Sequence, residues 1–271
     1  VRDGVYVENI DINKPLTIKS ENGSANCIVR AANSNDHVFN VTADNVTISG
    51  FTVTGAIGYS YDPKAGIHLY NSNYCRIENV NASNNCYGIT ILYSNNNIIA
   101  NNTALNNDCD GIYLGCSNNN IIENNTLSNN NDGISLYCSS NNIVVSNIAL
   151  NNFYGIVVRG SSNTIVNNIV SSNKYYGIFI CISTSNNIIY FNNFINNMEQ
   201  VISYSSINVW NSTSKITYTY NGKTYTNYLG NYWSDYKGSD ADGDGIGDTP
   251  YSIDGDKDYY PLVEPFENYF V

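Results

Sequence analysis

Apolar and polar residues alternate in short runs along most of the chain, and these runs return at a fixed distance. In each run an apolar residue is followed by any residue and then by another apolar one, as in Ile134-Ser135-Leu136. Such alternation indicates short, half-buried strands, and no segment shows a convincing helical period. A Gly-Ile pair opens each run and recurs every 22 or 23 residues, at Gly66-Ile67, Gly88-Ile89, Gly111-Ile112, Gly133-Ile134, Gly155-Ile156 and Gly177-Ile178. A period of this length predicts a solenoid, whose repeats bury their apolar faces by stacking.

Two further columns of residues identify the repeating unit. Asn pairs precede most of the glycines, and a branched aliphatic column runs through Ile99, Ile122, Val144, Val166 and Ile189. Each unit holds about three short strands joined by Asn and Gly turns. Asn tolerates left-handed backbone at corners, and its amide can bond the Asn of the coil above or below. We therefore predict an all-β fold, a right-handed parallel β-helix with three-strand coils of about 22 residues.

The repeat stops near Asn197, where the composition shifts toward Tyr and Thr. We predict a β-helix over residues 1–198, an aromatic-rich β-hairpin cap over 199–236, and an acidic tail over 237–271 packed on the solenoid. The hairpin pairs 216–220 with 223–227, because Asn221-Gly222 suits a two-residue turn with positive φ. Trp210 and Trp233 would cover the last coil, whose open strand edge otherwise invites pairing with another chain.

The net charge of the chain argues against some classes of binding partner. The formal net charge is −11 at pH 7, which argues against nucleic acid and anionic membranes because neither attracts a negative surface. Calcium or a neutral glycan is a better partner. The chain has no membrane-spanning run and starts at Val1 inside a strand, so we expect that a leader and an N-terminal cap are missing. We predict an extracellular or cell-surface protein that binds surface glycans or associates with itself.

Four cysteines fall into two pairs with matching places in the repeat. Cys86 and Cys109 stand two residues before the repeat glycine, and Cys116 and Cys138 stand five residues after it. Each pair should stack on adjacent coils, at a spacing that a disulfide can bridge. Coil-to-coil disulfides would indicate an oxidising compartment, and stacked thiols that serve as small core residues are the equal alternative.

Sequons of the Asn-X-Ser/Thr type are consistent with an exported glycoprotein, although an Asn-rich chain contains some by chance. They lie at Asn22, Asn40, Asn45, Asn81, Asn101, Asn124 and Asn211.

The most specific local motif is an acidic loop after the repeats. Carboxylates at alternate positions, separated by glycines, allow a short loop to surround a hard cation with oxygen ligands. We predict calcium, held by the side chains of Asp240, Asp242, Asp244 and Asp248 and by the backbone carbonyl of Ile246. The loop resembles those of EF-hands, dockerins and thrombospondin type 3 repeats, but Tyr251 replaces the expected bidentate Glu, which indicates a structural ion rather than a sensor. Downstream, Asp254, Asp256 and Asp258 would complete this site or form a second one.

Several segments together resemble one known family. These are the Asn-Asn-Ile-Ile and Gly-Ile repeats, residues Asn231-Tyr-Trp-Ser-Asp-Tyr236, the acidic loop and Asp258-Tyr-Tyr-Pro-Leu262. They are similar to NosD-type β-helix proteins, which are also grouped as carbohydrate-binding and sugar-hydrolysing repeats and are abundant as surface proteins of methanogenic archaea. The resemblance implies a right-handed β-helix of the pectate lyase type. It does not decide function, since this fold carries lyases, hydrolases, adhesins and scaffolds.

An enzyme acting on polysaccharide is one alternative function. A lyase or glycoside hydrolase needs paired carboxylates on one exposed face, and Asp110 and Asp132 each precede a repeat glycine, with Asp108 close by. The pair could equally consist of turn residues or hold a cation. The positions around it carry His68, Tyr87, Tyr137, Tyr154, Arg159 and Tyr176.

Copper-enzyme maturation, the role associated with NosD itself, is another alternative. Copper requires soft or imidazole ligands, which besides cysteine are here His37, His68 and Met198. The reading we adopt is a non-catalytic, calcium-stabilised surface protein that builds a layer, sheath or filament or acts as a glycan-binding adhesin.

Overall fold

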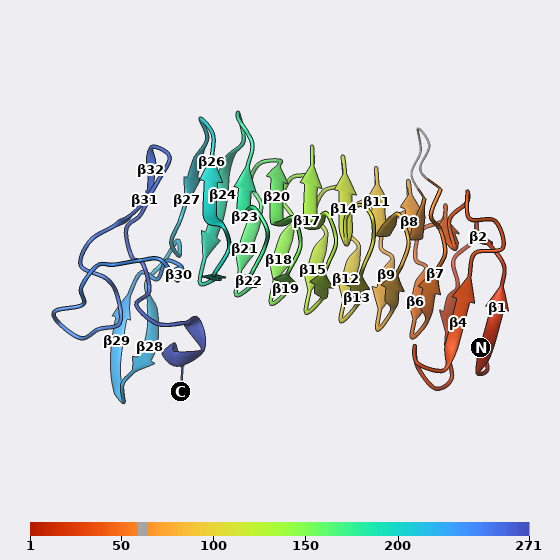
Figure 1. The fold of residues 1–271 in the computed structure, drawn as a ribbon, viewed down its shortest axis with the longest axis horizontal. Helices are drawn as coiled ribbons and strands as arrows, with labels where there is room; N and C mark the ends of the chain where they lie inside the picture. The colour runs from red at the N-terminus through yellow and green to blue at the C-terminus, as the bar shows by residue number, and fades with distance from the viewer. Residues whose placement is uncertain (59–63, 271) are drawn as a thin grey trace.

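The computed structural model describes residues 1–58 and 64–270. The chain forms an elongated rod of stacked coils, with the N-terminus at one end and a tail of irregular loops and hairpins at the other (Figure 1). Three parallel sheets, here called A, B and C, run along the rod. The predicted parallel β-helix is confirmed.

Each coil contributes one strand to each sheet. Sheet A contains β1 (Gly4–Val7), β4 (Cys27–Arg30), β7 (Thr52–Thr54), β10 (Asn81–Ser83), β13 (Thr103–Leu105), β16 (Thr126–Ser128), β19 (Ile148–Leu150), β22 (Ile169–Ser171), β25 (Asn193–Ile195) and β30 (Tyr232–Trp233). Sheet B contains β2 (Ile10–Ile12), β5 (Phe39–Val41), β8 (Ala65–Tyr70), β11 (Tyr87–Leu92), β14 (Ile112–Gly115), β17 (Asp132–Tyr137), β20 (Tyr154–Arg159), β23 (Tyr176–Ile180) and β26 (Glu199–Ser203). Sheet C contains β3 (Thr17–Lys19), β6 (Thr47–Ser49), β9 (Arg76–Glu78), β12 (Ile98–Ala100), β15 (Ile121–Glu123), β18 (Ile143–Val145), β21 (Thr164–Val166), β24 (Ser185–Tyr190) and β27 (Ile207–Val209).

The Gly-Ile repeat lies on sheet B and builds the core. Ile112 pairs in register with Ile134, and both side chains are fully buried in the same apolar cluster. The glycine is required by close approach, because a Cβ at Gly133 would lie 2.5 Å from the carbonyl oxygen of Gly155 on the next coil. The period in the sequence is therefore the period at which one coil rests on the next.

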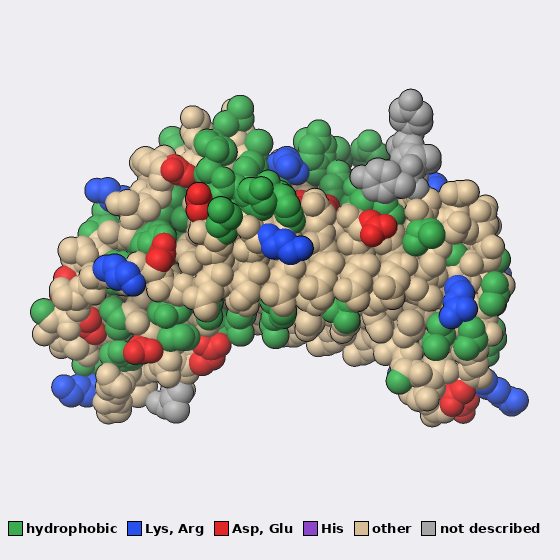
Figure 2. Space-filling model, viewed as in Figure 1, with side chains coloured by type: hydrophobic (Ala, Val, Ile, Leu, Met, Phe, Trp, Pro, Cys, Tyr) green, Lys and Arg blue, Asp and Glu red, His purple; other side chains and the backbone are tan. Residues whose placement is uncertain are grey.

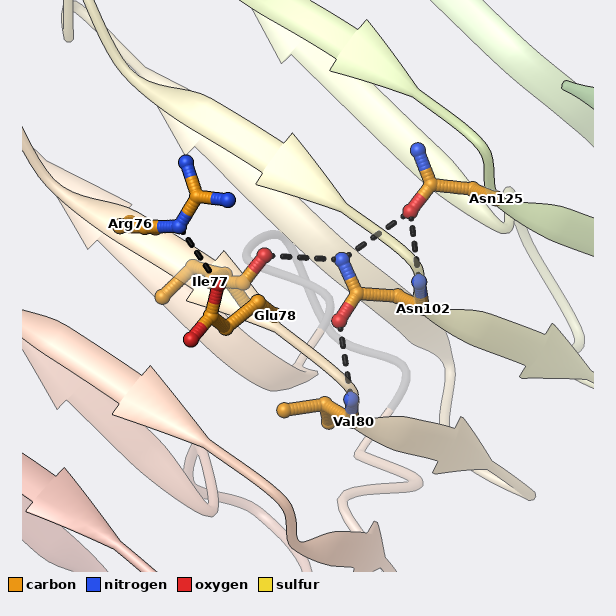
Figure 3. Close-up of polar contacts among 6 residues, drawn as sticks. All are labelled: Arg76, Ile77, Glu78, Val80, Asn102 and Asn125. Carbon is orange, nitrogen blue, oxygen red and sulfur yellow. Dashed lines mark hydrogen bonds and ion pairs between the residues drawn. The ribbon is translucent and has the colours of Figure 1, made fainter. Parts of the chain in front are cut away.

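The Asn pairs divide into two structural roles. The first Asn of a pair has positive φ at a corner, as at Asn101 (56°). The second is buried and bonds the coils on both sides, as Figure 3 shows for Asn102. Its Oδ1 accepts from Val80 N at 3.0 Å, and its Nδ2 donates to Ile77 O at 2.9 Å and to Asn125 Oδ1 at 3.0 Å. These amide ladders satisfy buried backbone groups that the sheets leave unpaired at the corners.

The coils continue beyond the boundary predicted at residue 198. β26 and β27 extend sheets B and C to Val209, and Val201 stands opposite Ile178 in register. An apolar residue thus continues the ladder without the Gly-Ile motif, which is why the sequence period does not reveal this coil. β30 then adds the last strand of sheet A.

The predicted hairpin is present, but it does not cover the core. β28 (Ile216–Tyr220) and β29 (Lys223–Asn227) pair antiparallel through Asn221-Gly222, both with positive φ. They pack with the 3-10 helix η1 (Phe266–Tyr269) in a separate small cluster. The core is closed instead by Trp233, whose ring stacks on Phe194 at 4.6 Å and on Tyr251 at 4.4 Å between centroids. Trp210 joins the same core, so the predicted covering role of both tryptophans is confirmed.

Candidate functional site

The outer face of sheet B differs from an ordinary solvated sheet face. On the strands of this sheet Ile134 and Leu136 point into the core, so the residues between them face outward. Three such short side chains are nevertheless almost completely buried: Thr90 is 4% exposed, Ser135 1% and Val157 1%. Larger neighbouring side chains must therefore cover the middle of this face.

Aromatic rings provide much of this cover. They form contacts from coil to coil on the outer side of sheet B and its adjoining turns, between Tyr87 and Tyr113, Tyr113 and Tyr137, Tyr154 and Tyr176, Tyr154 and Phe179, and Phe153 and Tyr175. Figure 2 shows hydrophobic side chains gathered along the upper rim of the rod, where the strands of sheet B lie in Figure 1, with charged side chains among them. Tyr137 and Tyr175 remain exposed to solvent. The rows form an extended aromatic surface along sheet B.

The predicted carboxylate pair lies under these rings. Asp110 precedes β14 and Asp132 opens β17, and Gly111 N donates to Asp132 O at 2.8 Å, so the two residues occupy adjacent coils. Asp110 is 6% exposed and Asp132 5% exposed. Asp108, by contrast, is an exposed residue. The structure therefore brings together Asp110 and Asp132 and leaves Asp108 outside.

Both carboxyl groups of the pair are buried, and burial raises the pKa of each. Burial is the main cause that raises the pKa of Asp110 well above its usual range, and the negative charge of Asp132 adds to it. Burial also raises the pKa of Asp132 to about 6, against the lowering effect of the Arg159 guanidinium. Both carboxyl groups therefore bind protons more readily than exposed aspartates do.

Ser135 is a further buried polar residue of sheet B that the sequence analysis did not identify. It lies on β17 in the same outward row as Thr90 and Val157. In the described part of the chain, its Oγ is the one buried side-chain oxygen or nitrogen for which the structure provides no hydrogen-bond partner. The only signal in the sequence is a small polar residue three positions after Asp132, which alternation alone does not distinguish from a strand residue.

The predicted calcium ligands also come together in part. One oxygen from each of Asp240, Asp242 and Asp244 lies within 4.8 Å of the others, and no second such group of His, Cys, Asp or Glu occurs within residues 1–58 and 64–270. Asp242, Asp244, Ile246 and Asp248 line a cavity of about 200 Å³. Burial, followed by the neighbouring negative charges, raises the pKa of Asp244. The loop thus concentrates negative charge with oxygen ligands alone.

The remaining loop contacts show what shapes it. Asp248 Oδ2 accepts from Ser239 Oγ and from Ala241 N, both at 2.9 Å. Asp240 Oδ1 accepts from Gly243 N at 2.9 Å. The loop is therefore folded by its own carboxylates, and Asp248 has one oxygen not used in these contacts.

Within the described residues, Asp254, Asp256 and Asp258 do not come together as a group of metal ligands. They lie on or between the tail strands β31 (Tyr251–Ile253) and β32 (Asp256–Asp258), and N–H groups surround their oxygens. Asp256 Oδ2 accepts from Trp210 Nε1 at 2.8 Å, and Asp258 Oδ2 accepts from Trp233 Nε1 at 3.0 Å. These carboxylates therefore attach the tail to the last coils.

The predicted cysteine pairs stack as expected. Cys86 and Cys109 are buried with their Sγ atoms 2.8 Å apart, and Cys109 N donates to Cys86 O at 2.7 Å. Cys116 and Cys138 are both exposed at corners with positive φ. The structure contains all four as thiols, so the coil-to-coil disulfides stay a prediction.

The sequon asparagines are all at least partly accessible. Asn22, Asn45, Asn101 and Asn124 are exposed, and the other three are partly buried. Glycosylation stays a prediction.

The two histidines lie near one end of sheet B. Their rings stack with centroids 4.1 Å apart and planes 7° apart. His37 Nδ1 accepts from Ala65 N at 3.1 Å, and His68 Nδ1 lies 2.7 Å from Thr90 Oγ1. Met198 is 72% exposed.

Comparison with known proteins places these features in context. The family model described as periplasmic copper-binding protein (NosD) matches residues 1–238. A curated relative, the "Cell surface glycoprotein" of Methanothermus fervidus, is 40% identical over 84 residues, which cover 31% of this chain and 12% of that protein. The chain thus spans about an eighth of the length of this relative.

Solved structures share the fold at low identity. The Dettilon tailspike protein aligns with a TM-score of 0.62 and 20% identity, over 73% of this chain and 44% of that one. The periplasmic alginate epimerase AlgG aligns with a TM-score of 0.56 and 19% identity, over 71% and 53%. Pectate lyase Pel9A aligns with a TM-score of 0.56 and 15% identity, over 76% and 68%. No helix in the described residues is long and apolar enough to cross a membrane.

Proposed function

The chain belongs to the NosD family, and on this basis we propose that it acts at a cell surface as a glycan-binding protein whose sugar contacts lie on the outer face of sheet B. The aromatic surface on that face carries the proposal. A tyrosine ring combines an apolar face with a polar hydroxyl, and sites for small polar molecules combine such rings with a few fixed polar groups. Rings repeated from coil to coil suit a polymer whose sugar units repeat along its length.

The class of glycan follows from charge. The chain carries a formal net charge of −11, and the middle of the face holds the Asp110 and Asp132 pair. A polyanionic glycan would be repelled by both, so a neutral glycan is favoured. The surface location is supported by the relative named as a cell surface glycoprotein. A polysaccharide partner is supported by the titles of the epimerase and lyase that share the fold.

Removing exposed rings from this face should weaken glycan binding. Each stacked ring contributes about 1 kcal/mol, so the double variant Tyr137→Ala/Tyr175→Ala should bind roughly 30-fold more weakly. A neutral-glycan array identifies the probe, and calorimetry with that glycan measures Kd. Tyr74→Ala, at an exposed corner between sheets B and C, serves as the matched control. Equal Kd values for the double variant and wild type would contradict the assignment of this face.

We also propose that the loop of Asp240, Asp242, Asp244, Ile246 and Asp248 holds a structural calcium ion. The clustered carboxylates and the oxygen-lined cavity beside them support this role. The loop is tied to the hairpin, since the Tyr218 hydroxyl donates to Asp244 O at 2.8 Å. An ion here would therefore hold together the tail and the β28–β29 hairpin.

Calcium removal should destabilise the protein. At a calcium concentration 100 times Kd, binding adds about 2.7 kcal/mol, which corresponds to a Tm higher by roughly 5–10 °C. Differential scanning calorimetry with calcium and with excess chelator measures this difference. Asp242→Asn/Asp244→Asn should abolish the response and Asp254→Asn should retain it, because Asp254 lies outside the cluster. An unchanged Tm on chelation would rule out a structural ion.

The described residues contain no group of three soft or imidazole ligands of the kind that copper prefers. Within residues 1–58 and 64–270 the one cluster of three His, Cys, Asp or Glu side chains offers only carboxylate oxygens, which suit hard cations rather than copper. One nitrogen of His37 is occupied by a backbone N–H, and Met198 points to solvent. We therefore assign no copper chemistry to these residues.

A further inference from the structure

Cys86 and Cys109 occupy one column of the solenoid on neighbouring coils. Cys109 N donates to Cys86 O at 2.7 Å, so the two residues lie directly one above the other. The same ladder of backbone hydrogen bonds continues through Ala56 on one side and through Asn131 and Phe153 on the other. Since the fold accepts a small, an amide or an aromatic side chain in this column, it does not require cysteine there. Two cysteines in succession therefore need another explanation.

From this arrangement we propose that Cys86 and Cys109 form a disulfide bond that joins two adjacent coils of the β-helix. The sequence alone favours neither disulfides nor thiols for the two stacked cysteine pairs, and the contacts of this pair favour the bond. The inference does not depend on glycan binding or on calcium. A disulfide indicates an oxidising compartment, which agrees with the proposed place at a cell surface.

The positions of the two sulfur atoms support a covalent bond. The Sγ atoms lie 2.8 Å apart, whereas even non-bonded carbon atoms, which are smaller than sulfur, prefer about 3.5–4.0 Å. The backbone ladder keeps equivalent residues on adjacent coils about 4.8 Å apart, within the Cα separation of about 4.4–6.8 Å that a disulfide spans. A small further approach of the side chains would bring the sulfur atoms to the bond length of about 2.05 Å.

Burial distinguishes this pair from the other stacked pair. Cys86 is 0% exposed and Cys109 is 9% exposed, whereas Cys116 and Cys138 are both exposed. A reducing agent has no access to a bond at the buried pair while the coils stay stacked, and exposed disulfides are the labile ones. The buried pair therefore suits a permanent structural bond, and the exposed pair provides the matched comparison.

The bond forms as the coils assemble, by exchange with a low-molecular-weight disulfide such as oxidised glutathione. Cys86 is the first nucleophile, because its hydrogen bond with Cys109 lowers the pKa of the Cys86 thiol and the thiolate is the reactive form. The Cys86 sulfur bonds to one sulfur of the reagent and releases the other as a small thiol. The Cys109 thiolate then attacks the Cys86 sulfur and releases the second small thiol. Two protein thiols lose two electrons and two protons, and one small disulfide gains them.

Peptide mapping tests for the bond directly. The full chain is refolded in a buffer of reduced and oxidised glutathione, unfolded with N-ethylmaleimide to block the remaining thiols, and digested. Trypsin cuts after Arg76, and chymotrypsin cuts after Tyr87 and Tyr113. Cys86 and Cys109 therefore fall in different peptides that contain no other cysteine. Mass spectrometry should detect these two peptides joined, and a reductant should separate them.

Thermal unfolding measures what the bond contributes. Cys86 and Cys109 are 23 residues apart, and a disulfide that closes a loop of this length should raise Tm by roughly 6–12 °C. The variant Cys116→Ser/Cys138→Ser is compared after refolding with glutathione and after refolding in reductant, so that the exposed pair does not contribute. Adding Cys86→Ser/Cys109→Ser to this variant should make Tm equal under both conditions.

The outcomes separate a bond from stacked thiols. Both cysteines blocked by N-ethylmaleimide, with no joined peptides, would overturn the bond. Glutathione attached to Cys86 or Cys109 without the joined peptides would overturn it as well. Loss of the joined peptides in Cys116→Ser/Cys138→Ser would overturn a direct link that forms without the exposed pair. Joined peptides with the same Tm in oxidised and reduced protein would overturn the stabilising role of the bond.

Discussion

Replacing Asn130 by Ala is expected to lower the free energy of unfolding by about 4 kcal/mol or more. Asn130 Oδ1 accepts from Asn107 N at 3.0 Å, and its Nδ2 donates to Ala104 O at 3.0 Å and to Asn152 Oδ1 at 3.1 Å. All of these groups lie in the buried ladder, and a buried polar group left unpaired costs about 1–3 kcal/mol. Urea denaturation followed by far-UV circular dichroism measures the change.

The neighbouring Asn129 provides the matched control. It is exposed, with φ of 55°, a conformation that glycine adopts without a Cβ penalty. Asn129→Gly should therefore change the free energy of unfolding by less than about 1 kcal/mol. If both substitutions destabilised the protein equally, the division of each Asn pair into a corner residue and a ladder residue would be wrong.

Replacing Asp132 by Asn is expected to stabilise the protein at neutral pH. The folded-state pKa of Asp132 is raised from 3.8 to about 6, so between these values the folded chain binds more protons than the unfolded chain. Stability contributed by this group is therefore greatest at acidic pH and falls as pH rises to about 6. The full shift corresponds to about 3 kcal/mol, and Asn removes this penalty because it does not ionise.

The experiment compares the free energies of unfolding at pH 4 and pH 7.5. Asp132→Asn should exceed wild type by about 2 kcal/mol at pH 7.5 and differ little at pH 4. Asp108→Asn is the control, since it removes one negative charge from an exposed side chain. A destabilised Asp132→Asn at pH 7.5 would mean that the carboxylate is fully compensated in the folded protein.

A gain in stability from removing Asp132 would show that the fold does not need this carboxylate. Proteins often retain buried charges and unpaired groups at functional sites at a cost in stability. The Asp110 and Asp132 pair and the Ser135 hydroxyl show these two features within sheet B and the turn that precedes β14. The Asn ladder has neither, which is consistent with a purely structural role.

The sequence by itself determined the repeat and its phase. A coil stacked on a copy of itself brings each position against the same position, so the Gly-Ile period predicts the core ladder of Ile112 and Ile134 and the closeness of Asp110 and Asp132. The Asn221-Gly222 turn was equally predictable, because backbone conformation there depends on two local residues. Because the coils stack in order, contacts between residues one repeat apart can be predicted from the period of the sequence alone.

Only the tertiary structure decided the contacts that do not follow the period. Asn231 continues the ladder of Asn192 across 39 residues, and Asp258 accepts the indole N–H of Trp233. No spacing in the sequence predicts such pairings, because they depend on where the tail returns to the rod. The burial of Ser135 likewise depends on which larger side chains cover it. Local patterns determine strands and turns, whereas the partners of a buried polar group are known only once all the surrounding segments are in place.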